Sequence, residues 1–274
     1  MPPPEKRQIH CLEDLEQIGE WCPKLKLWRR TVPLSTGASV ELLEDLSETD
    51  THGTHCLWPG SLVLSKFLEN CLAEELGLRN MRVLELGAGL GLCAMTAAAL
   101  GAEVIATERP GEALDFLRAN LHMNDATTSS RVSVEALDWA HRGAAQKLLA
   151  KYGQPHLVLG SDLCYNRDTI VMLQETMSEV AVGGTQVHIF MAQDQESVPG
   201  GTSISRQFFE ECLPVAGFSV QRQNDAAKFL GPQWSDPQIR LYRISLDESA
   251  VEKMSSDCAE STSIGKLDLC ESCR

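Results

Sequence analysis

The stretch VLELGAGLGL, residues 83–92, decides the fold of this chain. It begins with a short apolar run typical of a buried strand, and Gly87, Gly89 and Gly91 follow at once, before a helix-like segment. Glycine permits positive φ angles and lets a ligand approach the backbone closely. The stretch therefore predicts a strand, a ligand-binding loop and a helix, in that order.

The spacing of the glycines and two nearby acids narrow the class of ligand. Position 92 is Leu, so the G-x-G-x-x-G of a dinucleotide site is absent, and so is the G-K-S/T of a phosphate-binding loop. Glu85, just before the loop, would repel a phosphate and favour a positively charged group. Glu108 follows Gly87 by 21 residues, at a strand end, where it can accept hydrogen bonds from both hydroxyls of a ribose. S-adenosylmethionine has a ribose, a cationic portion and no phosphate.

The chain around this loop alternates strand-like and helix-like patterns. This alternation predicts an α/β fold: a Rossmann-like, seven-stranded, mostly parallel sheet with helices on both faces. The last two strands have no helix between them, so we expect an antiparallel last strand, paired with the strand before it at one edge of the sheet. The predicted strands are 81–86, 102–107, 131–137, 156–161, 185–192, 218–223 and 239–246. The predicted helices are 61–76, 92–101, 111–124, 168–181 (capped by Asn166 or Asp168) and 205–217.

The ends of the chain differ from its centre. We divide it into an N-terminal extension, 1–55, a central α/β domain, 56–246, and a tail, 247–274. Two alternating runs in the extension, 24–32 and 38–44, flank the turn-forming PLSTG and predict a β-hairpin. The tail has seven acids, three bases and few large hydrophobic residues, so we expect it to be disordered.

Composition excludes several function classes. The formal net charge of −14 disfavours non-specific binding of nucleic acid, and we interpret the basic cluster Lys24, Lys26, Arg29 and Arg30 as a solvated strand face. No apolar run suits a membrane helix, and the N-terminus lacks the core of a signal peptide. We therefore expect a cytoplasmic or nuclear protein without membrane partners, and we favour a monomer.

Cysteine and histidine patterns do not predict a metal site. The ten cysteines are irregularly spaced, as expected for small buried hydrophobic residues in a reducing compartment. Two short groups lack the four ligands of a structural zinc site: Cys270 with Cys273, and His52 with His55 and Cys56.

Five segments together carry a family resemblance: 57–68 (LWPGSLVLSKFL), 83–92, 104–121 (VIATERPGEALDFLRANL), 137–140 (LDWA) and 157–165 (LVLGSDLCY). They resemble the class I S-adenosylmethionine-dependent methyltransferases, and more narrowly the seven-β-strand protein-lysine methyltransferases often called family 16. The resemblance implies an enzyme with S-adenosylmethionine as cofactor and a protein lysine as acceptor. The implied cofactor-binding residues are Trp58, Glu85, Gly87, Ala88, Gly89, Gly91, Glu108, Arg109, Asp138, Trp139 and Ser161.

The same resemblance implies the catalytic pair. SDLCY, residues 161–165, matches the D/E-x-x-Y/F pattern of family 16 with Asp162 and Tyr165, at the end of a strand expected beside the first. Asp162 would orient the acceptor nitrogen, and Tyr165 would line its channel with a cation–π contact worth about 0.5–2 kcal/mol. In-line methyl transfer from a sulfonium needs alignment and no metal.

Alternative interpretations stay open. Asp162 could cap a helix, Trp58 could anchor the core, and Trp139 could lie in an interface. The protein could methylate a small molecule, or bind S-adenosylmethionine without catalysis. Methylation of nucleic-acid bases is disfavoured, because Leu163 and Cys164 replace the two prolines of the N/D-P-P-Y pattern.

Overall fold

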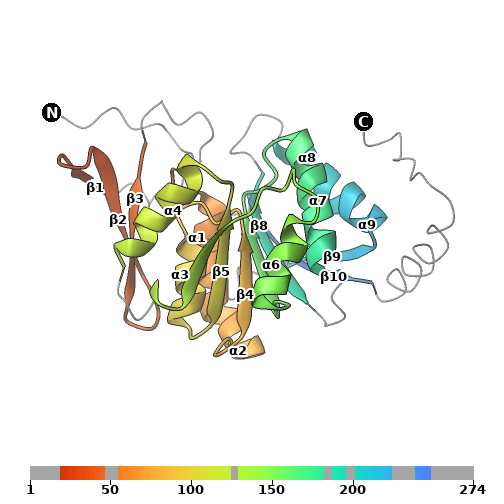
Figure 1. The fold of residues 1–274 in the computed structure, drawn as a ribbon, viewed down its shortest axis with the longest axis horizontal. Helices are drawn as coiled ribbons and strands as arrows, with labels where there is room; N and C mark the ends of the chain where they lie inside the picture. Colours follow the sequence, from red (N-terminus) through yellow and green to blue (C-terminus); the bar gives the residue numbers. More distant parts are fainter. Residues whose placement is uncertain are drawn as a thin grey trace.

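A seven-stranded sheet forms the centre of the molecule (Figure 1). The computed structural model describes residues 19–46, 55–124, 129–181, 187–195, 201–223 and 238–247. The strand order is β6-β5-β4-β7-β8-β10-β9. The strands are β4 (Arg82–Leu86), β5 (Glu103–Glu108), β6 (Val132–Ala136), β7 (Leu157–Ser161), β8 (His188–Asp194), β9 (Phe218–Arg222) and β10 (Ile239–Leu246).

The pairing directions confirm the predicted fold class. Strands β6, β5, β4, β7 and β8 pair in parallel, and β10 is antiparallel to both β8 and β9. The predicted antiparallel pair is therefore present. The pair lies at one edge of the sheet, with β9 outermost and β10 between β9 and β8.

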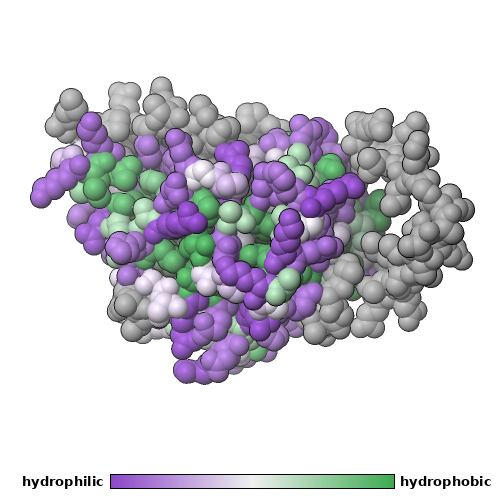
Figure 2. Space-filling model, in the orientation of Figure 1, coloured by the Kyte–Doolittle hydropathy of each residue, from purple (hydrophilic) through white to green (hydrophobic). Residues whose placement is uncertain are grey.

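Helices cover both faces of the sheet (Figure 1). One face packs on α1, α3 and α4, and the other on α6, α7 and the segment after α8. The face seen in Figure 2 is largely hydrophilic, with hydrophobic side chains between polar ones. The helical segments are α1 (Pro59–Phe67), η2 (Leu68–Leu72), α2 (Ala73–Leu76), α3 (Leu92–Ala99), α4 (Glu112–His122), α6 (Ala144–Tyr152), α7 (Arg167–Ala181), α8 (Gly201–Arg206), η3 (Gln207–Cys212) and α9 (Leu213–Val215).

Two of these helical regions bear on the predictions. Helix α6 was not predicted, and it buries Ala145 and Leu148. Helix α7 begins where expected, and Asn166 supplies the cap: its Oδ1 accepts a hydrogen bond from the Thr169 backbone N–H at 2.7 Å.

The described part of the N-terminal extension forms a separate three-stranded sheet. Its strands, β1 (Gly19–Cys22), β2 (Leu27–Pro33) and β3 (Ser39–Glu44), are antiparallel in the order β1-β2-β3. The predicted hairpin is β2 with β3, whereas the four-residue β1 was not predicted.

One side chain of α4 and one just beyond its end hold this small sheet against the rest of the molecule. Asn120 Oδ1 accepts the Leu43 N–H at 2.6 Å, and its Nδ2 donates to the Leu43 carbonyl. One turn later, Asn124 accepts the Glu41 N–H and donates to the Glu41 carbonyl, each at 2.8 Å. The two side-chain amides thus form hydrogen bonds with backbone groups on the edge of β3 that does not pair with β2. The expected tail lies outside the described residues beyond Asp247.

Candidate cofactor and acceptor site

The predicted site residues gather at the carboxyl ends of four neighbouring strands. The glycine loop follows β4, Glu108 ends β5, Asp138 and Trp139 follow β6, and Ser161 ends β7. Strand ends of a parallel sheet meet at one edge, and there open α/β sheets bind their ligands. The ring of Trp139 lies 3.4 Å from the position that a Cβ would take at Gly87, so these two ends are in contact.

The three loop glycines serve different purposes. Their φ angles are +58° at Gly87, +54° at Gly89 and +87° at Gly91. A Cβ at Gly87 would lie 2.7 Å from Leu163, and one at Gly91 would lie 2.7 Å from Leu117. Beside Gly89, no atom lies within 4 Å of that position. Gly87 and Gly91 therefore permit close packing, and Gly89 leaves open space where a ligand can approach the loop.

Glu85 is a buried acid with an unpartnered oxygen. Its side chain is 1% exposed, and burial raises its pKa to about 8. Its Oε2 is buried without a hydrogen-bond partner among the described residues. Such an oxygen costs free energy unless a ligand satisfies it. This chemistry fits the cationic end of S-adenosylmethionine.

Glu108 is held in place by two backbone groups. Its Oε2 accepts the Gly89 N–H at 3.0 Å, and its Oε1 accepts the Arg109 N–H at 2.8 Å. Burial raises the pKa of this carboxyl, and these two donors lower it. Each carboxylate oxygen keeps a second lone pair, so both can still accept a ribose hydroxyl. Arg109 is exposed; its backbone N–H contacts Glu108, and its charge also lowers the pKa of that carboxyl.

Three more predicted cofactor residues have clear structural partners. Asp138 accepts the Ala140 N–H at 3.0 Å and lies 3.0 Å from the His141 ring nitrogen. Trp58 is half-buried and packs beside a small cluster of buried residues that includes Trp28. Trp58 thus anchors the small sheet to the start of α1. The backbone of Ala88 donates to Thr107, which fixes the loop to β5.

Asp162 joins two distant elements through one carboxylate. Its Oδ2 accepts the Gly60 N–H in the first turn of α1, and its Oδ1 accepts the Asp194 N–H at the end of β8, each at 2.7 Å. The residue has a φ of +54°, and burial, with the Asp194 charge nearby, raises its pKa to about 7. Asp162 does cap a helix, but that helix is α1.

Tyr165 is the exposed member of the predicted catalytic pair. Its side chain is 47% exposed, while the neighbouring Cys164 is buried and its N–H donates to Gln193 Oε1 at 2.9 Å. The turn after β7 therefore leaves Asp162 half-buried and presents Tyr165 to solvent.

Gly60 and Asp194 are site residues that sequence reasoning missed. A Cβ at Gly60 would lie 2.5 Å from Asp162 Oδ2, so only glycine permits this contact. Asp194 is 3% exposed. The Pro-Gly pair at the start of α1 is a signal that indicates a helix start, but no spacing rule connects it to position 162.

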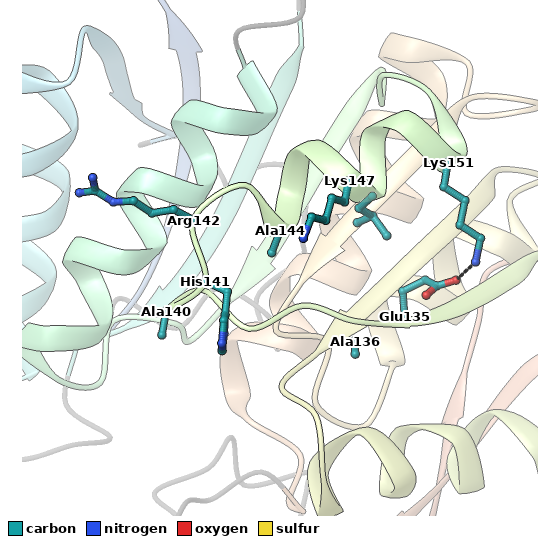
Figure 3. Close-up of a pocket in the computed structure, with 9 residues that line it drawn as sticks. Glu135, Ala136, Ala140, His141, Arg142, Ala144, Lys147 and Lys151 are labelled. Atoms are coloured by element: carbon teal, nitrogen blue, oxygen red, sulfur yellow. Dashed lines mark hydrogen bonds and ion pairs between the residues drawn. The ribbon is translucent and has the colours of Figure 1, made fainter.

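A separate surface cavity of about 660 Å³ contains none of the predicted site residues (Figure 3). It is lined by Glu135, Ala136, Ala140, His141, Arg142, Ala144, Lys147, Leu148 and Lys151. Within the described ranges, no group of three His, Cys, Asp or Glu residues could hold a metal ion. No helix in the same ranges is long and apolar enough to cross a membrane.

Sequence comparison places these residues in a known family. A family model described as lysine methyltransferase matches residues 37–212. Protein N-lysine methyltransferase METTL21A of Xenopus tropicalis is 40% identical over 139 residues, 50% of this chain and 59% of that protein. EEF1A lysine methyltransferase 3 of Mus musculus is 30% identical over 204 residues, 73% of this chain and 77% of that protein. The matches to METTL21A relatives span between 54% and 59% of their length.

Solved structures share the fold. A SAM-dependent methyltransferase from Agrobacterium tumefaciens has a TM-score of 0.50 and 15% identity, with 84% of this chain and 77% of that chain covered. The glycopeptide N-methyltransferase MtfA, complexed with sinefungin, also has a TM-score of 0.50, at 17% identity, with 72% of this chain and 97% of that chain covered. The family model covers more than half of the sequence and all the predicted site residues, and this chain therefore belongs to the lysine methyltransferase family.

Proposed function

We propose that this protein transfers a methyl group from S-adenosylmethionine to a lysine amine of a protein substrate. The observation that carries the proposal is the pair of buried acids beside the glycine loop: Glu85 has an unpartnered oxygen, and Glu108 is fixed by backbone donors. A cation and a ribose are the groups that these acids suit, and the family match supports lysine as the acceptor.

Different residues at the strand ends would bind different parts of the cofactor. Glu85 would hold the cationic methionine portion, the Gly87–Gly89 loop would wrap it, and Glu108 would accept the ribose hydroxyls. Trp139 would lie beside the adenine. When bound, the cofactor supplies a methyl group on a sulfonium, which is an electrophile that needs no metal.

Asp162 would orient the acceptor. A lysine arrives protonated, because its ordinary pKa is about 10.4. The Asp162 carboxylate already accepts two backbone N–H groups, which fix its direction, and each oxygen can accept one more donor from the ammonium. A carboxylate that stabilises the ammonium does not remove its proton, so the proton leaves to water. Tyr165 would line the entrance.

The protonation state of Asp162 predicts a pH dependence. Its pKa is raised to about 7, so below that pH the carboxyl is neutral and attracts an ammonium less. We expect methyl transfer to rise as the pH increases through about 7. In Asp162→Asn this step should vanish from the pH profile, and the residual rate should be low throughout.

The partners of the enzyme follow from the same proposal. The names of the relatives support a protein substrate, and we propose a cytoplasmic or nuclear monomer without nucleic-acid or membrane partners.

Label transfer tests the function directly. Purified protein and Asp162→Ala would each be incubated with radiolabelled S-adenosylmethionine and a proteome extract, followed by gel and mass spectrometry. We expect a discrete labelled band with a methylated lysine, lost in the variant. Cofactor binding without any labelled protein would contradict the proposal and favour a small-molecule acceptor or a non-catalytic binder.

A further inference from the structure

One segment of this acidic chain is free of acids. Residues 139–161 contain Arg142, Lys147, Lys151 and two histidines but no Asp or Glu, although the whole chain has a net charge of −14. The segment forms the loop after β6, helix α6 and strand β7. Its three cationic side chains, Arg142, Lys147 and Lys151, belong to the loop after β6 and to α6.

These cations surround the cavity of about 660 Å³. Figure 3 shows Lys147 and Lys151 projecting from α6 on the side of the strand that carries Glu135 and Ala136. We call this cavity, with the strand edge beside it, the α6–β6 groove. Because Glu135 and Ala136 belong to β6, the groove has a strand as one of its walls.

The wall formed by β6 is an open sheet edge. Among the described residues, β6 pairs only with β5. The Val104 N–H donates to the Arg131 carbonyl, and the Leu137 N–H donates to the Glu108 carbonyl. Odd-numbered residues of β6 therefore direct their backbone groups toward β5. By the alternation of a strand, Val132, Val134 and Ala136 direct theirs outward, and Ala136 lines the groove.

The cations of the groove are available to an incoming acid. Lys147 has no ion pair in the part of the chain that the structure describes. Lys151 pairs with Glu135, and Arg142 pairs with Glu175, each at 2.6 Å. The cations of both pairs are well exposed, and exposed pairs are worth about 0–1 kcal/mol, so they exchange partners readily.

We propose that the α6–β6 groove binds an extended acidic segment of a partner protein as an added strand on β6. The outward backbone groups supply the hydrogen bonds, and alternate side chains of the segment face Lys147 and Lys151. The backbone of a nucleic acid cannot form a strand ladder, and the overall charge repels it. This binding is independent of the proposed methyl transfer.

A short fluorescent peptide of alternating glutamate and threonine is a suitable probe. Its affinity would be measured by anisotropy for the full chain without cofactor. Lys147→Gln/Lys151→Gln should weaken binding at least about tenfold. Lys24→Gln/Lys26→Gln is the matched control: it removes the same charge from another exposed site and should change the affinity less than about twofold. Equal losses of peptide affinity in the two variants would mean that net charge alone attracts the peptide. That result would overturn the proposal.

Two further measurements separate strand addition from simple attraction. Two versions of the peptide would be N-methylated at alternate amides, one at the odd positions and one at the even positions, so that both keep their charges. Only one version loses the N–H groups that face the edge of β6, and that version should no longer bind. In hydrogen exchange, the amides of Val134 and Ala136 should gain protection with the peptide, while that of Glu135 should not change. Undiminished binding of both methylated peptides, unchanged exchange, or tighter binding of a single-stranded oligonucleotide would contradict the proposal.

Discussion

At the scale of single residues, the proposed acceptor site depends on the hydrogen bonds that fix Asp162. The sequence placed it correctly after a strand, because an apolar run ending in a polar pair is a local pattern. Its partners, the N–H groups of Gly60 and Asp194, were beyond prediction. They lie on other elements, and only the folded sheet brings them to one carboxylate.

Gly60→Ala tests this contact. The new Cβ would lie 2.5 Å from Asp162 Oδ2 and would force the carboxylate to move. We expect kcat to fall by about tenfold to a hundredfold, since misplacement of about 1 Å has this effect, while the affinity for the cofactor changes little. Gly19→Ala is the control, because its Cβ would make only ordinary contacts at 3.8 Å or more. Steady-state kinetics would decide, and an unchanged kcat in Gly60→Ala would contradict the positioning role.

Glu85→Gln tests the buried acid beside the loop. Burial raises the Glu85 pKa from 4.5 to about 8, so between these values the unfolded chain releases a proton that the folded protein keeps. The contribution of Glu85 to stability therefore falls as the pH rises from about 4.5 to 8. We expect the variant to be more stable than the wild type at pH 8.5 without ligand, yet to bind S-adenosylmethionine more weakly.

Thermal unfolding across this pH range, with calorimetry of cofactor binding, would check both parts of the Glu85 prediction. Lower stability of Glu85→Gln at high pH would show that the hydrogen bonds of Glu85 with the Ala94 backbone and the Cys93 side chain outweigh the cost of burying its charge. Unchanged cofactor affinity would remove Glu85 from the binding site.

At the scale of elements, prediction succeeded where the pattern was local. The alternating residues of β2 and β3 identify a hairpin, and glycine loops mark strand ends. Strand β1 was missed because it has only four residues, whereas helix α6 was missed although its apolar residues follow a helical period. The docking of the small sheet could not be predicted either, since side chains of Asn120 and Asn124 replace a neighbouring strand.

The asparagine contacts predict a graded loss of stability. Asn120 is buried, so Asn120→Ala leaves the Leu43 backbone groups without partners and should cost about 2–4 kcal/mol of unfolding free energy. Asn124→Ala acts at a more exposed place and should cost about 1–2 kcal/mol. Exposed Gln146→Ala is the control and should stay within about 0.5 kcal/mol. Denaturant unfolding would measure all three, and equal stabilities would contradict this docking.

At the scale of the whole molecule, strand order creates the site. The sequence predicts the parallel sheet, but only the order β6-β5-β4-β7 makes four strand ends neighbours. The overall negative charge is also a property of the sequence, whereas the concentration of cations along the α6–β6 groove depends on the fold. Residues adjacent at the site come from positions as far apart as Gly60 and Asp194.

The central claim is that these strand ends form one S-adenosylmethionine site. Calorimetric titration of the cofactor into wild type, Glu108→Ala and Glu103→Ala tests it most directly, because both acids lie on β5 but only Glu108 is at its carboxyl end. We expect Glu108→Ala to lose at least about tenfold in affinity and Glu103→Ala to match the wild type. Wild-type affinity in Glu108→Ala, or no binding by the wild type, would contradict the account.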